Sequence, residues 1–306
     1  MLHRLSPRLY KALRQLGNND HNHLLAKLLI LQNNSRKIAR LKDAEFKVYS
    51  QFGDDGIIQY LINTIKFDKA EEKFIEIGTE DYLESNIRFL LINNNWSGLV
   101  VDADKNNIEF IKKDDIYWKH DLTAVQAFVT RDNINKIIKD SSYVGKIGLL
   151  SIDIDGNDYW ILNAIDIVDP VIIVVEYNGL FGFKHALTIP YQANFTRYNS
   201  HYSGLFWGCS LKALDVLSRK KGYKFIGTNS AGNNAYFVKK ERMVHLKPVS
   251  LSKGYTLPKY REARDKKGSL TFASGDKRLH LIRQKKLYDI MANKKVEIKG
   301  LFDVQV

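Results

Sequence analysis

Short runs of β-branched and aliphatic residues alternate with longer amphipathic stretches through the middle of the 306-residue chain. Runs of this length are typical of buried strands, and the stretches between them are long enough to form helices. The expected strands are Lys73 to Ile77, Gly98 to Asp102, Ile147 to Asp153 and Val171 to Glu176, with a weaker run at Ile116 to Lys119. The alternation indicates a mainly parallel sheet that is covered by helices on both faces.

Two further strands are expected near the end of this region, and their connection is of a different kind. Lys224 to Gly227 and Ala235 to Val238 are separated by Thr228-Asn-Ser-Ala-Gly-Asn-Asn234, whose Asn and Gly content favours a turn over a crossover helix. The predicted fold is therefore α/β and Rossmann-like, with an antiparallel terminal strand pair. This ending is characteristic of class I methyltransferases, whereas the sheet of dinucleotide dehydrogenases continues with parallel strands.

The two ends of the chain do not follow this alternation, so three regions are predicted: residues 1–48, 49–240 and 241–306. The first region contains two helical stretches on either side of Gly17-Asn-Asn-Asp20, with Leu5, Leu9, Leu13 and Leu16 at helical spacing. It is expected to form a helical lid or dimerisation arm, or a basic amphipathic attachment to a membrane surface. In the last region, which is punctuated by Pro and Gly, Arg278 to Met291 is compatible with a basic helix.

The net charge of +13 is confined to the two ends, because residues 1–48 carry +7, residues 49–240 carry −3 and residues 241–306 carry +9. An enzyme that acts on nucleic acid would carry positive potential around its active-site domain as well, which disfavours that partner. The basic ends suit an anionic membrane surface or a phosphate-bearing glycan. With no apolar run of about 20 residues and a single cysteine, Cys209, the chain is expected in the cytoplasm, either free or peripheral to a membrane.

Ligands of an open parallel sheet bind beyond the carboxyl ends of its strands, so the residues that end each strand are candidate site residues. The first strand ends in Glu76-Ile-Gly78, where Gly78 permits close approach of a ligand and Glu76 can accept hydrogen bonds from a cofactor amine. The second strand ends in Asp102, which can accept hydrogen bonds from both hydroxyls of a ribose. The acidic loop Thr79-Glu-Asp-Tyr82 would repel a pyrophosphate but suits a cationic sulfonium, which favours S-adenosylmethionine.

Four segments occur in a specific order along residues 49–240. They are Tyr49-Ser-Gln-Phe-Gly-Asp-Asp-Gly56, Glu76-Ile-Gly78 continuing to Glu84-Ser-Asn86, Leu99-Val-Val-Asp102, and Ser151-Ile-Asp-Ile-Asp-Gly-Asn-Asp-Tyr-Trp160. This combination resembles the FkbM-type methyltransferases and neighbouring class I families, although Glu80 and Tyr82 stand where further glycines often occur. The resemblance implies that Gln51 and Asn86 bind the amino-acid end of the cofactor and that Asp121 with Leu122 flanks the adenine.

Acidic residues also end the third and fourth strands. Asp153 and Asp155 point to one side if both are extended, and Glu176-Tyr-Asn178 ends the neighbouring strand. Asp155, Glu176 and Asn178 offer the oxygen ligands that Mg²⁺ favours, and such an ion would lower the pKa of a substrate hydroxyl. The alternative is metal-free general-base catalysis by Asp153, Asp155 or His201. Asp158 is expected to cap the following helix.

An aromatic-rich insertion follows the Glu176 strand and is the candidate substrate lid. Aromatic faces suit sugar rings, although most of these side chains are expected to pack in a core. The resemblance implies O-methylation of a hydroxyl on a sugar or surface glycan precursor, as in polysaccharide biosynthesis. The alternatives are a non-catalytic, membrane-associated assembly protein with a methyltransferase-like fold, and an RNA methyltransferase that is recruited through its basic ends.

Overall fold

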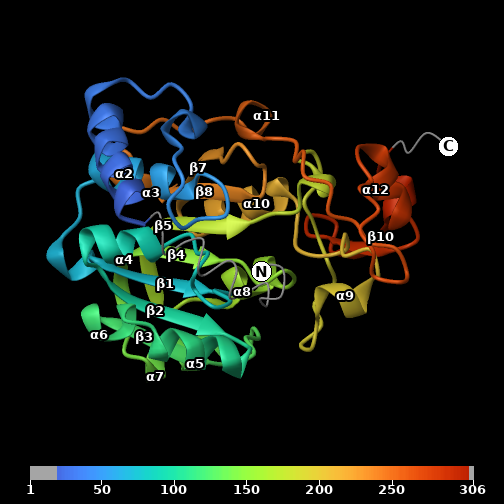
Figure 1. Ribbon diagram of the computed structural model, residues 1–306. Helices are drawn as coiled ribbons and strands as arrows, with labels where there is room; N and C mark the ends of the chain where they lie inside the picture. Colours follow the sequence, from blue (N-terminus) through green and yellow to red (C-terminus); the bar gives the residue numbers. More distant parts are fainter. Residues whose placement is uncertain (1–18, 303–306) are drawn as a thin grey trace, which may run out of the picture.

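A seven-stranded sheet forms the centre of the molecule, and the computed structural model describes residues 19–302 (Figure 1). The strand order is β3-β2-β1-β4-β5-β8-β7. Neighbouring strands from β3 to β5 are parallel, whereas β8 runs antiparallel to both β5 and β7. The strands are β1 (Lys73–Ile77), β2 (Ser97–Asp102), β3 (Leu122–Gln126), β4 (Gly145–Ile152), β5 (Val168–Glu176), β7 (Tyr223–Thr228) and β8 (Asn234–Lys239). The Rossmann-like α/β fold with an antiparallel ending is thus confirmed.

The turn between β7 and β8 has the form that its sequence predicts. The side-chain Oδ1 of Asn229 accepts hydrogen bonds from the backbone N–H groups of Gly232, Asn233 and Asn234, at 3.0, 3.2 and 3.3 Å. A short polar side chain thus replaces backbone partners in a tight turn. The chain reverses within a few residues, and β8 enters the sheet beside β5 in the antiparallel direction.

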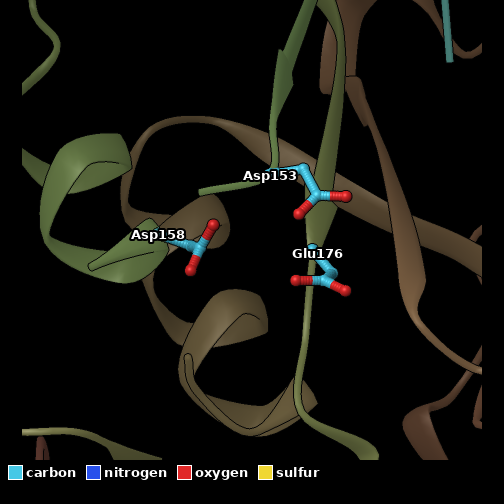
Figure 2. A group of neighbouring side chains, drawn as sticks. All are labelled: Asp153, Asp158 and Glu176. Carbon is cyan, nitrogen blue, oxygen red and sulfur yellow. The ribbon is translucent and has the colours of Figure 1, made fainter. Parts of the chain in front are cut away.

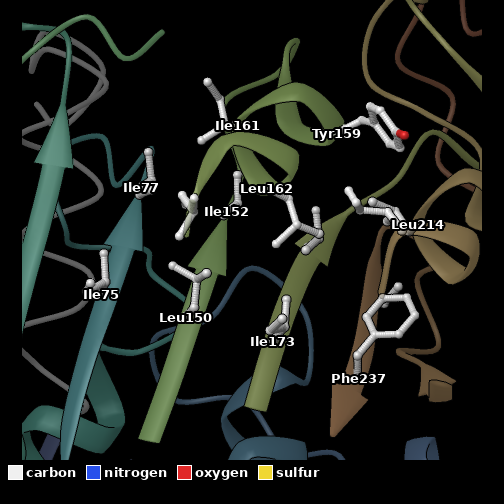
Figure 3. Close-up of a cluster of buried hydrophobic side chains, with 14 of the residues drawn as sticks. Ile75, Ile77, Leu150, Ile152, Tyr159, Ile161, Leu162, Ile173, Leu214 and Phe237 are labelled. Atoms are coloured by element: carbon white, nitrogen blue, oxygen red, sulfur yellow. The ribbon is translucent and has the colours of Figure 1, made fainter. Parts of the chain in front are cut away.

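Helices cover both faces of the sheet because successive strand residues point to opposite faces. Ile75, Leu150 and Ile173 face a core that includes residues of α7, α8 and α10, as Figure 3 shows in part. Phe74 and Leu149, one residue away in each strand, face the second core with α3, α4 and α5. These helices are α3 (Asp54–Thr64), α4 (Arg88–Asn94), α5 (Lys105–Lys113), α7 (Ile134–Asp140), α8 (Asp158–Ala164) and α10 (Leu211–Lys220).

One segment that was expected to form a strand is helical in the structure. The run Ile116–Lys119 forms a short helix, α6, and the third strand begins only at Leu122, so the expected strand was wrong. The Lys119 ammonium pairs with Asp115 at 2.8 Å, a spacing of four residues that suits a helix and not a strand.

At the N-terminus, α2 (Asn19–Ser35) is one of the two expected helices. The other, with Leu5 to Leu16, lies outside the described residues.

A second, three-stranded sheet has the order β10-β9-β6 and lies beyond the carboxyl ends of the parallel strands (Figure 1). It combines β6 (Leu187–Thr188) from the aromatic-rich insertion with β9 (Lys286–Asp289) and β10 (Lys294–Glu297) from the C-terminal region. The basic helix expected at Arg278–Met291 was therefore wrong beyond Leu281, where α12 (Asp276–Leu281) ends. Leu287 instead packs with Leu187 and Ile298 in a third core, which favours pairing as a strand.

The aromatic-rich insertion and the C-terminal region share this third core, and we refer to residues 179–209 and 258–302 together as the cap unit. Buried Phe181, Phe195 and Trp207 from the insertion lie in one cluster with Ala263 and Ile282 from the C-terminal region. The remaining short helices are α9 (Arg197–Ser200), α11 (Leu251–Gly254), and the 3₁₀ turns Leu41–Ala44, Lys69–Glu71, Gly179–Phe181, Lys240–Arg242 and Ile298–Gly300. None of the helices within residues 19–302 is long and apolar enough to cross a bilayer.

Candidate functional site

A cavity of about 510 Å³ lies where the carboxyl ends of β1 to β5 meet the cap unit. This volume is in the range of small-molecule sites, and the position is the one that open parallel sheets use for ligands. Each strand contributes residues that follow its last paired position. They are Gly78 and Thr79 after β1, Asp102 and Ala103 after β2, Ala127 to Val129 after β3, Asp153 to Asp155 after β4, and Glu176 at the end of β5.

Gly78 forms the tightest point of the cavity floor. Its φ angle is +84°, and a Cβ atom at this position would lie 1.6 Å from the carbonyl oxygen of Asp153. Its N–H group donates to the carbonyl oxygen of Val101 at 2.8 Å, which joins the loop to β2. Glycine is required here both by the positive φ and by the approach of the neighbouring chain. The predicted close-approach position is thus at the cavity.

Glu76 is 3% exposed and lines the cavity from the end of β1. Its carboxylate accepts hydrogen bonds from the Ser85 hydroxyl at 2.6 Å and from the backbone N–H of Asn86 at 3.0 Å. Burial outweighs these two donors and raises the pKa of Glu76 to about 7. The same Ser85 hydroxyl accepts from the N–H groups of Ile87 and Arg88, so Glu76 is coupled to the start of α4. A cationic ligand would stabilise the ionised form of this carboxyl group.

Asp102 lies across the cavity from Glu76, one strand further toward the edge. Its Oδ1 accepts from the N–H of Asp104 at 2.8 Å and from the Asn107 side chain at 3.0 Å. Its Oδ2 accepts from the N–H of Glu80 at 2.9 Å, which leaves a second lone pair on that oxygen. The loops after β1 and β2 are therefore held together by one carboxylate that lines the cavity.

The segment Tyr49–Gly56 is held against the sheet by its own acidic residues. The Asp55 carboxylate accepts from the backbone N–H groups of Val48, Tyr49 and Ser50 at 2.7 to 2.8 Å. This loop carries Gln51 to the cavity wall, and Asn86 lines the same wall from the start of α4. Gln51 lies two residues before Gly53, which is the N-cap of α3, and so does not cap this helix. Both residues that the resemblance assigned to the amino-acid end of a cofactor thus line the cavity.

Asp121 is placed away from the cavity, which contradicts its expected role beside an adenine. The third strand runs from Leu122 to Gln126, so Asp121 precedes the strand and lies at the opposite edge of the sheet. The expectation followed from the family resemblance alone, and the run before Asp121 forms α6. The carboxyl end of β3 instead brings Ala127, Phe128 and Val129 to the cavity.

Three acidic groups gather at the ends of β4 and β5, where half-buried Asp153 and buried Asp158 and Glu176 each place one oxygen within 4.8 Å of the others (Figure 2). Asp153 and Glu176 hydrogen-bond to each other through their carboxyl groups. Burial, followed by repulsion from the neighbouring carboxylates, raises both pKa values well above their ordinary range. A hydrogen bond between two carboxyl groups requires a proton on one of them, so the two groups form a coupled acid–base pair.

The predicted magnesium ligands are not brought together. Asp155 adopts a φ of +53°, which turns it out of the extended strand, and its carboxylate pairs with Arg197 at 2.7 Å. The Asn178 side chain donates to the carbonyl oxygens of Leu205 and Trp207, both at 3.0 Å, and so supports the cap unit. Glu176 and Asp155 both line the cavity, but only Glu176 belongs to the cluster with Asp153 and Asp158.

Among the described residues, the group that could hold a divalent cation is Asp153, Asp158 and Glu176. Glu176 Oε2 is buried without a hydrogen-bond donor, which suits a ligand position. Asp158, however, accepts from the backbone N–H groups of Ile154 and Gly156 at 2.9 and 3.0 Å. Asp158 therefore closes the turn before α8. It is the first residue of that helix, and the N-cap is Asn157, so the expected capping position was wrong by one residue.

His201, the third candidate base, does not line the cavity. Its Nδ1 atom hydrogen-bonds to the Ser203 hydroxyl at 2.7 Å, and its ring packs on Tyr202. Burial and the nearby ammonium of Lys285 lower its pKa. The histidine thus stabilises the loop after α9, and the candidate bases that remain at the cavity are Asp153 and Asp155.

Part of the cavity wall comes from the C-terminal region, which sequence analysis separated from the catalytic domain. Tyr260 and Glu262 line the cavity, and the Tyr260 ring stacks on Phe52 with a centroid distance of 6.5 Å. The buried guanidinium of Arg278 donates to the carbonyl oxygens of Tyr260 and Pro258, at 3.1 and 3.0 Å. No local pattern in the sequence marks these residues, because their neighbours are distant along the chain.

The comparisons with known proteins give similar folds only. No protein-family model matches the sequence, and no curated protein matches it. Among solved structures, the methyltransferase domain of bacterial CtHen1 is 16% identical with a TM-score of 0.33, covering 55% of this chain and 90% of that chain. An S-adenosylmethionine-dependent methyltransferase from Clostridium acetobutylicum is 9% identical with a TM-score of 0.37, covering 61% and 90%. An O-methyltransferase family protein from Burkholderia thailandensis is 8% identical with a TM-score of 0.35, covering 54% and 49%. The fold assignment rests on the strand order and directions of the chain itself.

Proposed function

We propose that the chain is an S-adenosylmethionine-dependent O-methyltransferase that acts on a hydroxyl group of a sugar or glycan precursor. The observation that carries this proposal is the charge of the cavity at the carboxyl edge of the sheet. Eight acidic residues line it, and Arg197 is the one Lys, Arg or His residue among its described lining. A cavity of this kind favours a cationic ligand over an anionic one.

The acidic charge of the cavity distinguishes between dinucleotides and S-adenosylmethionine, two classes of cofactor that bind at the carboxyl edge of such sheets. At an effective dielectric constant of about 20 and a separation of about 6 Å, each carboxylate would repel a phosphate charge by about 3 kcal/mol. A dinucleotide would place its pyrophosphate at the loop after β1, where Glu80 and Glu84 line the cavity. A sulfonium cofactor is attracted by the same residues. Glu76 and Asp102 then suit its amine and its ribose hydroxyls.

Asp153 is the group best placed to act as the general base. When bound, S-adenosylmethionine supplies a methyl group whose bond to sulfur breaks as the bond to the acceptor oxygen forms, which leaves S-adenosylhomocysteine and a methyl ether. Asp153 accepts the proton of the acceptor hydroxyl, and Glu176 holds the Asp153 carboxylate in place through their shared hydrogen bond. Asp155 is a weaker candidate because Arg197 occupies its carboxylate.

The sugar or glycan acceptor is supported by the cap unit, which brings aromatic side chains to the cavity. Tyr198, Trp207 and Tyr260 line it from this side. Aromatic faces pack against the apolar faces of sugar rings, and tyrosine hydroxyls add hydrogen bonds to ring hydroxyls. In the proposed complex the acceptor lies between the cap unit and the Asp153–Glu176 pair.

Calorimetric titration with S-adenosylmethionine tests the proposal. We expect binding to the unmodified protein and at least about tenfold weaker binding to Asp102→Asn, because the ribose hydroxyls lose a charged acceptor. The matched control is Asp140→Asn, which removes a carboxylate that is 61% exposed on α7. No binding to the unmodified protein, or equal binding to Asp102→Asn, would contradict the proposed function.

A further inference from the structure

The acceptor side of the cavity has one basic side chain among its described lining, Arg197, and each of its three nitrogen atoms donates a hydrogen bond within the protein. Nη1 donates to Asp155 Oδ1 at 2.7 Å, Nη2 donates to Glu262 Oε2 at 3.1 Å, and Nε donates to the carbonyl oxygen of Gly204 at 2.6 Å. The guanidinium carbon lies 5.1 Å from the centre of the Trp207 ring. The Arg197 side chain is only 12% exposed.

The partners of Arg197 are themselves fixed. Glu262 accepts a second hydrogen bond from the Tyr198 hydroxyl at 3.0 Å, and Tyr198 also packs against the Arg197 guanidinium. Two carboxylates therefore compensate one guanidinium charge, so this cluster carries no surplus positive charge. A planar guanidinium binds phosphate or carboxylate through a bidentate pair of N–H groups. In Arg197 those groups already face Asp155 and Glu262.

The other ionisable groups on this side are acidic and add no cation. Asp153, Glu176 and Glu76 line the cavity along the carboxyl edge of the sheet. An anionic acceptor would meet these carboxylates without a free cation to offset them, which costs free energy for each buried charge. The basic residues at the two ends of the sequence add no positive charge to the cavity, because none of them within the described residues lines it.

We infer that the part of the acceptor that enters this cavity carries no negative charge, so that neutral or ammonium-bearing hydroxyl compounds are accepted and phosphorylated or carboxylated ones are excluded. This inference rests on the proposed function. It replaces the expectation, drawn from the basic ends alone, that a phosphate-bearing glycan enters the site. Asp155 and Glu262 are then specificity-determining residues, because they hold Arg197 away from anions.

Inorganic phosphate serves as the probe for this inference, in a comparison of four proteins at constant ionic strength. They are the unmodified protein, Arg197→Gln, the double variant Asp155→Asn/Glu262→Gln, and the triple variant that combines all three substitutions. We expect Arg197→Gln to leave phosphate affinity unchanged within about twofold, because the basic surface residues are common to both proteins. The double variant should bind phosphate at least about tenfold more tightly, and the triple variant should lose that gain.

Two results would overturn the inference: weaker phosphate binding by Arg197→Gln alone, or no gain in the double variant. Asp43→Asn is the matched control, since it frees Arg40 from a surface pair at 2.7 Å that lies outside the cavity lining. Affinity for S-adenosylhomocysteine, measured on each protein, checks that the cavity is intact. If the glutamine variant fails this check, Arg197→Lys replaces it. Failure of the unmodified protein to bind S-adenosylhomocysteine would count against the proposed function and not against the phosphate result.

Discussion

Glu76 offers a test in which stability and ligand binding change in opposite directions. Burial raises its pKa from 4.5 to about 7 in the folded protein. At about 1.4 kcal/mol for each pH unit, the ionised carboxylate destabilises the fold by about 3 kcal/mol at most. Between pH 4.5 and 7 the folded protein binds a proton that the unfolded chain has released, so the contribution of Glu76 to stability is lost as the pH rises through this range.

Glu76→Gln removes this titration but also disturbs the two hydrogen bonds that the carboxylate accepts from Ser85 and Asn86. One of them is expected to be lost, because the amide offers one acceptor oxygen, and this costs about 1 kcal/mol. Ionisation of Glu76 already costs about 0.8 kcal/mol at pH 5, so the variant should be about as stable as the unmodified protein there and more stable by about 2 kcal/mol at pH 8.

Urea unfolding at pH 5 and pH 8 without cofactor measures this difference. Glu109→Gln, a change on α5 at a side chain that is 48% exposed, is the control and should shift stability by less than about 0.5 kcal/mol at both pH values. A difference between Glu76→Gln and the unmodified protein that is the same at both pH values would refute the argument from burial. We also expect the stabilised variant to bind S-adenosylmethionine at least about tenfold more weakly, because a neutral amide replaces the acceptor for its amine.

Three further changes test separate parts of the site. Gly78→Ala should destabilise the protein by about 3 kcal/mol or more in urea unfolding, whereas Gly145→Ala, at a φ of +80° with open space around its Cβ, should cost only about 1 kcal/mol. Asp153→Asn should lower kcat about 100-fold or more while S-adenosylmethionine affinity stays within about threefold; an unchanged kcat would exclude Asp153 as the base. Arg278→Lys should destabilise the protein by about 1 to 2 kcal/mol, since an ammonium cannot hold both carbonyl groups of the cavity wall as the planar guanidinium does. Equal melting temperatures of this variant and the unmodified protein would contradict this role.

The strands and their closing turn were predictable because their signals are local. Lys73–Ile77 is a β-branched run of strand length that is followed by a glycine, and the structure has β1 with these bounds. The Asn-rich segment after Thr228 carries its own turn partner in Asn229. The site could be placed at the carboxyl edge because parallel strands share that edge, so Glu76, Gly78 and Asp102 line the cavity.

The errors of sequence analysis follow from missing tertiary contacts. Asp121 was assigned to the site by the family resemblance, but it precedes β3 and so lies at the opposite edge of the sheet. Asp155 and Asn178 have the chemistry of metal ligands in the sequence. In the structure Asp155 pairs with Arg197, and Asn178 donates to the carbonyl oxygen of Leu205. Both contacts depend on how the cap unit folds against the sheet.

The sequence by itself determined the sheet, its antiparallel ending and the acidic character of the strand ends, because neighbouring residues produce each of these features. Only the tertiary structure decided which acidic groups remain available to a ligand. Arg197 and Glu262 are 65 residues apart and belong to different predicted regions, yet they form one wall of the cavity. The raised pKa values of Asp153 and Glu176 likewise arise from burial and from neighbouring carboxylates, and these surroundings exist only after β4 and β5 have paired.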